Sequence, residues 1–180
     1  MDTRLLRSVF MIGSLMFGSA VAVAQEMPKE SVLPLSLAQR ASQVAIDACK
    51  KDGYRVSVSV VDRAGLLRAM GRADGAGPHT IDSSRKKAYT AASLRRATSE
   101  LADLMSRTPA LQALRDMNEQ ILMLGGGLPI ELGGEVVGAI GVGGAPGTHL
   151  DDACAEAGLD AIGVSSAEKG PLLNTLFDLQ

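Results

Sequence analysis

The sequence predicts an α+β fold in which helices pack on an antiparallel sheet built from hairpins. Two observations carry this prediction. The elements follow the order helix, hairpin, helices, hairpin, helix, and a short turn joins the two strands of each hairpin. A hairpin pairs its strands antiparallel, whereas a doubly wound fold alternates single strands with helices. We therefore expect one sheet with helices packed against it.

The N-terminus has the features of a secretory signal peptide. Arg4 and Arg7 give a positive start, residues 8–21 form an uncharged and mostly apolar run, and Ala22-Val23-Ala24 is an A-x-A cleavage site. A membrane anchor is the alternative, but a span needs about 20 apolar residues and this run is rich in Gly, Ser and Ala. We expect a periplasmic or secreted protein with no stable membrane span after cleavage. The chain then divides into a signal peptide at 1–24, an N-terminal arm at 25–35, a domain at 36–165 and a C-terminal tail at 166–180.

The first helix and hairpin follow from capping and periodicity. Ser36 and Gln39 form a capping box that opens a helix over 36–52. Valines that alternate with small polar residues predict a strand at 55–61, and 66–72 can return beside it. Further helices are expected at 79–96, 98–106 and 109–118, the last opened by Pro109.

Two strands are expected at 128–132 and 135–142, because Gly133-Gly134 between apolar runs is a hairpin signal. Thr148, together with Asp151, is expected to cap a last helix that ends near 162.

Ten of the 20 glycines fall within 125–147, which invites a nucleotide-binding interpretation. The loop at 141–147 follows a strand and precedes a helix, but Pro146 stands where the third glycine of G-x-G-x-x-G belongs. The preceding strand is also a hairpin arm. We expect tight turns and close backbone approach instead. Balanced charge, with 18 basic and 20 acidic residues, and 3% aromatic residues also disfavour nucleic-acid binding.

The two cysteines, Cys49 and Cys154, each lie on a predicted helix. In an oxidising compartment they can form one disulfide if those helices are neighbours. Two buried thiols are the alternative, and the sequence leaves both open.

The predicted helix from His79 carries the main basic concentration: Arg85, Lys86, Lys87, Arg95 and Arg96. Such charge forms either a solvated face or a site for an anionic ligand such as a carboxylate or propionate. His79 and His149 have no metal-ligand spacing typical of zinc, although a single His suffices as an axial ligand to haem iron. A surface or capping role is the alternative for either His. No recognisable catalytic motif is present.

These segments together resemble the GlcG/HbpS (DUF336) family over roughly 35–163. The matching blocks are Val60–Gly65, Arg72–Thr80, Lys87–Ala91, Gly127–Ile130, Gly138–Ala145, Asp151-Asp152 and Ala157–Ala161. The resemblance implies an antiparallel, profilin-like layer with helices packed on it, and homo-oligomers. It also implies haem or iron binding, which several secreted members show. One departure is Gly143, where many relatives have Ser.

The resemblance implies haem as the cofactor and an extracytoplasmic haem- or iron-binding, sensing or storage function, and it favours a binding protein over an enzyme without deciding between them. His79 is the candidate iron ligand, because it lies in the matching Gly-Pro-His-Thr block. Arg85 and Lys87 are expected to pair with propionates and Tyr89 to line the pocket, and Asp74 and Thr90 complete the candidate cofactor-binding set. Two alternatives stay open: an enzyme or accessory protein acting on a small organic acid of the glycolate type, and a structural oligomer without a small ligand.

Overall fold

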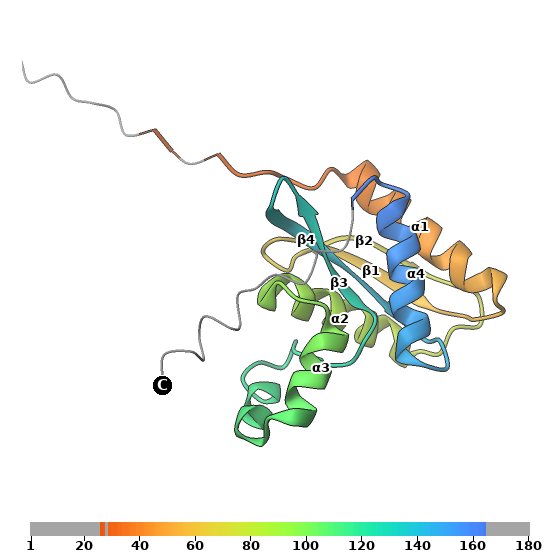
Figure 1. Ribbon diagram of the computed structural model, residues 1–180. Helices are drawn as coiled ribbons and strands as arrows, with labels where there is room; N and C mark the ends of the chain where they lie inside the picture. Colours follow the sequence, from red (N-terminus) through yellow and green to blue (C-terminus); the bar gives the residue numbers. More distant parts are fainter. Residues whose placement is uncertain (1–25, 28, 165–180) are drawn as a thin grey trace, which may run out of the picture.

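A computed structural model describes residues 26–27 and 29–164 (Figure 1). The predicted signal peptide and C-terminal tail lie outside the described residues. The elements are α1 (Leu35–Lys51), β1 (Ser57–Asp62), β2 (Leu67–Arg72), α2 (His79–Leu94), α3 (Thr98–Arg107), the 3-10 helix η1 (Pro109–Arg115), β3 (Gly127–Leu132), β4 (Glu135–Gly143) and α4 (Thr148–Asp160). The predicted order of helix, hairpin, helices, hairpin, helix is therefore confirmed.

The two hairpins join into one antiparallel sheet with the strand order β2-β1-β4-β3. β1 and β4 pair across the middle, from Ser57 opposite Gly143 to Asp62 opposite Gly138. The second hairpin turns at Gly133 and Gly134, which have φ values of 60° and 80°. Glycine adopts this left-handed region without strain, which is why the pair ends one strand and starts the next.

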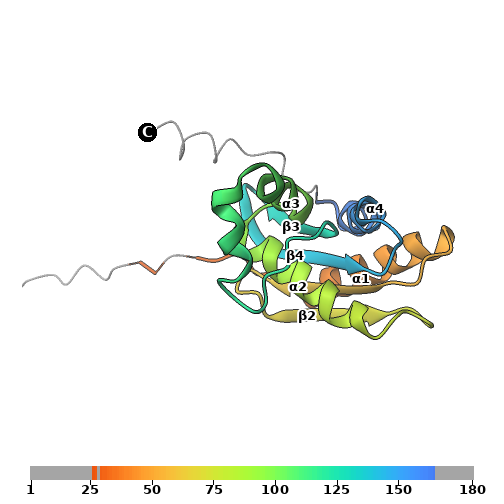
Figure 2. The same cartoon turned by 90° about the horizontal axis from the view of Figure 1, so that it is seen from below.

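Helices cover both faces of the sheet (Figure 2). One face packs on α1 and α4 and contains the larger core, which includes Val58, Val60 and Ile140. The other face packs on α2 through a core of small residues: Val61, Ala88, Ala91, Ala92 and Ala139. The larger core also takes in Leu33, which is fully buried although it belongs to the predicted arm.

Small side chains let α2 approach the sheet closely. A Cβ added at Gly141 would collide with the carbonyl oxygen of Ser84 and would lie 2.5 Å from the amide nitrogen of Ala88. Two buried hydroxyl pairs also join α2 to β1: Ser57 with Thr80 at 2.7 Å, and Ser59 with Ser84 at 2.9 Å. These contacts fix the position of α2, which carries most of the predicted site residues.

Both predicted helix caps are wrong. α1 begins at Leu35 after Pro34, with no side-chain cap, so Ser36 already lies within the helix. Pro34 is the N-cap residue and has an extended backbone, with φ −63° and ψ 142°, so the helix begins one residue earlier than the capping box predicts. α4 has Gly147 at its N-cap position and no side-chain cap. Asp151 lies within the first turn of the helix, where it pairs with Lys87.

Two helix ends also differ from the prediction. α2 stops at Leu94 rather than near 96, because Arg95 adopts a left-handed backbone with φ 54°. The helix expected at 109–118 is a 3-10 helix that ends at Arg115.

Over the described ranges, no helix combines the length and apolar character needed to cross a bilayer. The same residues contain no group of three or more His, Cys, Asp or Glu side chains arranged to hold a metal ion.

Candidate functional site

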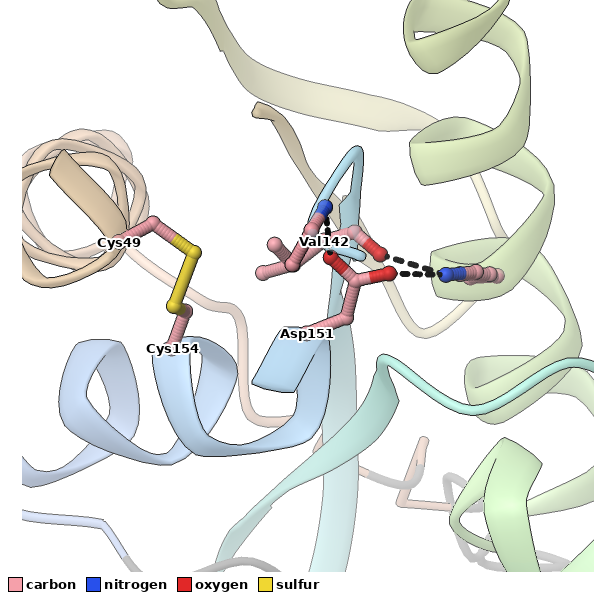
Figure 3. The surroundings of a disulfide bond; sticks show 6 residues. Cys49, Val142, Asp151 and Cys154 are labelled. Atoms are coloured by element: carbon pink, nitrogen blue, oxygen red, sulfur yellow. Dashed lines mark hydrogen bonds and ion pairs between the residues drawn. A yellow bond between two sulfur atoms is a disulfide. The ribbon is translucent and has the colours of Figure 1, made fainter. Parts of the chain in front are cut away.

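A buried ion pair joins α2 to the first turn of α4 at the end of β4. The Lys87 Nζ donates to Asp151 Oδ2 at 2.7 Å and to the Val142 carbonyl oxygen at 2.9 Å. The two side chains are 2% and 5% exposed. Figure 3 shows Asp151 and Val142 side by side with the interactions that they accept. A charge buried this deeply is tolerated only when it is paired and hydrogen-bonded, so the two residues depend on each other.

Asp151 also fixes the loop between β4 and α4. Its Oδ1 accepts a hydrogen bond from the Ala145 amide at 3.0 Å. Burial raises the pKa of Asp151, although the Lys87 ammonium and the hydrogen bonds from Ala145 and Gly144 oppose that rise. The carboxylate lies in the first turn of α4, where the helix dipole favours negative charge.

The neighbouring carboxylate holds the loop that precedes β3. Asp152 Oδ1 accepts from the Gly126 amide at 2.5 Å, and Thr98 Oγ1 accepts from the Gly127 amide at 2.8 Å. Burial raises the pKa of Asp152, with the Gly126 amide and the Ser99 hydroxyl acting against it. A Cβ at Gly126 would lie 2.5 Å from the Val142 carbonyl oxygen and 2.8 Å from Lys87 Nζ. These glycines allow close backbone approach, as the sequence predicts.

The role expected for Lys87 does not fit this structure. Its ammonium lies in the interior and is occupied by Asp151 and Val142, so it is not available to a propionate. The side chain instead holds α2, β4 and α4 together.

His79 is exposed at the first residue of α2. Its ring lies over Gly77, where an added Cβ would come within 2.7 Å of the imidazole Cε1. His149 repeats this arrangement over Gly147 at the start of α4, again with 2.7 Å to Cε1. The two histidines are thus matched in local geometry and differ in their surroundings.

The basic residues on and just after α2 are largely paired with nearby carboxylates. Arg85 and Lys86 both contact Asp82, at 3.4 Å and 3.2 Å. Arg96 pairs with Glu100 at 3.1 Å. Exposed pairs of this kind contribute little to stability, so Arg85 and Lys86 can exchange Asp82 for a ligand anion at small cost.

Tyr89 and Thr90 point in different directions from α2. The Tyr89 ring lies against Gly65 in the β1–β2 turn, where an added Cβ would be 2.6 Å from Cδ2. Thr90 is buried, donates to the Lys86 carbonyl oxygen and accepts from the Leu122 amide, both at 2.8 Å. Thr90 therefore holds the segment before β3, whereas Tyr89 stays half-exposed on the surface.

Asp74 lies apart from these residues, in a groove between α1 and β2. The groove has a volume of about 510 Å³ and includes Lys50, Tyr54, Arg55 and Arg72. Sequence reasoning missed it, because its basic residues come from three separate segments and form no local pattern. The sequence does place basic residues on either side of β1. That pattern does not show that their segments line one groove.

The outward-facing residues of α2 fit the haem that the sequence resemblance implies. The exposed imidazole of His79 is a suitable iron ligand. Arg85 and Lys86 offer cations for propionates, and the half-exposed ring of Tyr89 offers a flat surface. Of the predicted set, His79, Arg85 and Tyr89 are accessible, whereas Lys87 and Thr90 are internal.

Cys49 of α1 and Cys154 of α4 form a disulfide with a Cα–Cα distance of 5.5 Å (Figure 3). The sequence left this pairing open because it does not show that α1 and α4 are neighbours. The bond joins the two helices that cover the same face of the sheet.

Comparison with known proteins adds family evidence to this geometry. Residues 33–160 match the family model described as haem degrading protein HbpS-like. An uncharacterized 15.0 kDa protein from the dhaT-dhaS intergenic region of Citrobacter freundii is 37% identical over 131 residues, covering 72% of this chain and 92% of the relative.

Two solved structures share the fold and much of the length. A double mutant of HbpS from Streptomyces reticuli has a TM-score of 0.70 and 40% identity, covering 79% of this chain and 97% of that one. The PduOC:haem complex has a TM-score of 0.71 and 25% identity, covering 77% of this chain and all of that one. The antiparallel sheet with its packed helices is therefore shared with HbpS.

Proposed function

Since the chain belongs to the HbpS-like family, we propose that it is an extracytoplasmic haem-binding protein. The observation that carries the proposal is the exposed imidazole of His79 at the start of α2, in a family whose structural relatives include a haem complex. His79 Nε2 or Nδ1 would ligate the iron. Bound haem would supply a redox-active iron that no side chain of this protein provides.

The residues around His79 would orient the ligand. Arg85 lies six residues further along α2 and Lys86 seven, so both stand about two helical turns away on the outward side. Each would release part of its contact with Asp82 to pair with a propionate. Tyr89 is held by its packing on Gly65 and would limit the position of an apolar edge.

Two features support the extracytoplasmic part of the proposal. The first 24 residues have the sequence of a cleavable signal peptide. The Cys49–Cys154 disulfide is of a kind typical of proteins that fold in an oxidising compartment. Expression of the full chain in a Gram-negative host tests this: the mature protein should be recovered from the periplasm with Gln25 at its N-terminus. Recovery of the uncleaved chain from the cytoplasm would contradict it.

Haem titration of the mature protein tests the binding function. We expect a saturable Soret band, and a shift or loss of that band in His79→Ala. His149→Ala is the matched control, because that ring has the same exposed position over a glycine, and it should titrate like the parent. If His79→Ala still binds haem, the haem-binding function stands but His79 is excluded as the iron ligand. Absorbance no different from that of an unrelated protein would exclude haem binding.

We also propose that the protein forms homo-oligomers, as the family resemblance implies. Leu66 and Leu67 in the first hairpin are 65% and 51% exposed beside the free edge of β2. A second copy of the chain would cover this apolar edge. Sedimentation velocity should give a mass above that of the monomer, and Leu66→Lys with Leu67→Lys should lower it. A monomer in the parent protein would contradict the proposal.

A further inference from the structure

The α2 side of β2 is left open by the helices. α2 packs mainly on β1, β3 and β4, whereas β2 is the edge strand beyond β1. α1 covers β2 from the opposite face, where a Cβ added at Gly71 would lie 2.5 Å from Ile46 Cδ1. In the part of the chain that the structure describes, the face of β2 on the α2 side therefore has no helix packed over it.

The register of the first hairpin directs Met70 and Arg72 to this open face. Ser57 and Ser59 of β1 bond to hydroxyls of α2, so their side chains point toward that helix. Their partners directly across in β2 are Arg72 and Met70, respectively. Opposite residues of an antiparallel pair share a face of the sheet. Arg72 also borders the groove beside α1, but this register places its side chain on the α2 side.

Ile81, Arg85 and Tyr89 form the row of α2 that lies toward the first hairpin. The three residues are spaced four apart, so they share one side of the helix. Tyr89 fixes the direction of this row, because its ring lies against Gly65 in the β1–β2 turn. Lys87 leaves α2 on the other side, toward α4. All three side chains of the row are half-buried, so each keeps part of its surface in contact with solvent.

The α2–β2 shelf is the surface between these two rows, and it comprises Met70, Arg72, Ile81, Arg85 and Tyr89. The hydroxyl pairs between α2 and β1 hold the two rows in a fixed position along each other. Met70, which is 41% exposed, and Ile81 give the shelf an apolar area, and the Tyr89 ring adds an aromatic side. The shelf thus combines apolar surface with two guanidinium groups.

Both guanidinium groups can receive an anion. Arg72 Nε donates to the Ala76 carbonyl oxygen at 3.1 Å, which holds the side chain in place. Among the described residues, no carboxylate oxygen lies within 4.0 Å of the Arg72 guanidinium nitrogens. Arg85 contacts Asp82 at 3.4 Å, but Lys86 shares that carboxylate at 3.2 Å. The shelf therefore carries positive charge, which favours an apolar ligand that has carboxylates.

We propose that the α2–β2 shelf binds the porphyrin ring of haem, with Arg72 as a propionate partner beside Arg85. Met70 and Ile81 would contact the apolar ring, which would remove their surface from water. This inference rests on the proposed haem-binding function and extends its site from α2 to β2. Because the ring and the propionates make these contacts, a metal-free porphyrin should bind as well, and its binding should not require His79.

Deuteroporphyrin IX, a metal-free porphyrin that carries propionates, is a suitable probe. Its fluorescence should change saturably when it is titrated with the mature protein. His79→Ala should bind deuteroporphyrin like the parent, because the probe has no iron to ligate, whereas the haem Soret band should shift or disappear in the same variant. No saturable change with deuteroporphyrin would overturn the inference.

Met70→Glu and Met70→Gln form a matched pair that tests the shelf. The two new side chains have the same length, and only the first adds a negative charge near Arg72 and Arg85. Deuteroporphyrin should bind at least about tenfold more weakly to Met70→Glu than to Met70→Gln. Equal affinity of the two variants would contradict a carboxylate ligand on the shelf.

Arg72→Gln should weaken deuteroporphyrin binding by about tenfold, because it removes a charge-assisted hydrogen bond. Arg40→Gln is the matched control, since Arg40 is an exposed arginine of α1 on the opposite face of the sheet. It should bind the probe like the parent, and an equal loss in both variants would count against Arg72 as the propionate partner.

Haem titration of the same variants separates this inference from the proposed function. Haem affinity should also fall in Met70→Glu and Arg72→Gln. If both variants bind haem and deuteroporphyrin as tightly as the parent, the shelf is excluded, while a Soret band that depends on His79 keeps the proposed function. If the parent gives no saturable Soret band, the haem-binding function itself fails.

Discussion

Asp151 and Cys154 lie three residues apart on α4, and both side chains point into the interior. Cys154 is bonded to Cys49 of α1 on its own side of the sheet, whereas Asp151 pairs with Lys87 of α2 on the opposite side (Figure 3). Residues at this spacing occupy one face of a helix. The first turn of α4 is therefore tied to both helical layers.

The ion pair predicts a large stability loss when one partner is removed. Lys87→Met leaves the Asp151 carboxylate buried without its cation, and the free energy of unfolding should fall by about 3–5 kcal/mol. Urea denaturation followed by circular dichroism measures this. The double variant Lys87→Met with Asp151→Asn should recover part of the loss, because no charge then stays buried. A loss below about 1 kcal/mol in the single variant would contradict a mutually dependent pair.

Asp152 predicts a specific pH dependence of stability. Burial raises its pKa above the ordinary value of 3.8, so the folded state holds the proton to a higher pH than the unfolded state does. Its contribution to stability is then fully present below pH 3.8 and is lost as the pH rises through the folded pKa. Asp152→Asn removes this contribution and keeps an oxygen to accept from Gly126.

Denaturation of the parent and of Asp152→Asn at several pH values tests this. The stability of the parent relative to the variant should decrease as the pH rises from below 3.8 to 7. Asp160→Asn, an exposed position on the same helix, should follow the parent across this range. A parent that gains stability relative to Asp152→Asn as the pH rises would show the opposite sign.

The disulfide predicts a loss of stability on removal. It closes a loop with a sequence separation of 105, and loss of such a constraint typically costs about 2–4 kcal/mol. Cys49→Ala with Cys154→Ala should lower the free energy of unfolding by about that amount, and reduction of the parent should have the same effect. Alkylation of either thiol in the folded, unreduced protein would contradict the bond.

Substitution of Gly141 should cause a steric clash that substitution of a glycine with free space around it does not. Gly141→Ala places a methyl group against the backbone of α2 and should cost about 3 kcal/mol, near the upper range for overpacking. Gly133→Ala is the comparison, because an added Cβ there meets nothing within 4 Å and the cost is backbone strain alone, about 1 kcal/mol. Thermal unfolding of both variants gives the order, and similar losses would show that α2 can move away from β4.

The sequence alone determined the elements, their order and the family. Alternating valines and the Gly133-Gly134 turn are local signals, and each depends on residues close together in the chain. The same residues did not show that β1 pairs with β4, nor that α1 lies beside α4, and so the Cys49–Cys154 bond stayed open. Pairings between distant segments depend on packing that no local pattern encodes.

The tertiary structure decided what individual residues do. Lys87 and Arg85 belong to one basic stretch in the sequence, yet Lys87 is buried against Asp151 and Arg85 is half-exposed beside Asp82. The two residues lie on different sides of α2, and the close approach allowed by Gly126 and Gly141 buries only one of them. Lys50 and Asp74 line one groove for the same reason: the fold, and not their spacing in the chain, brings α1 beside the loop after β2.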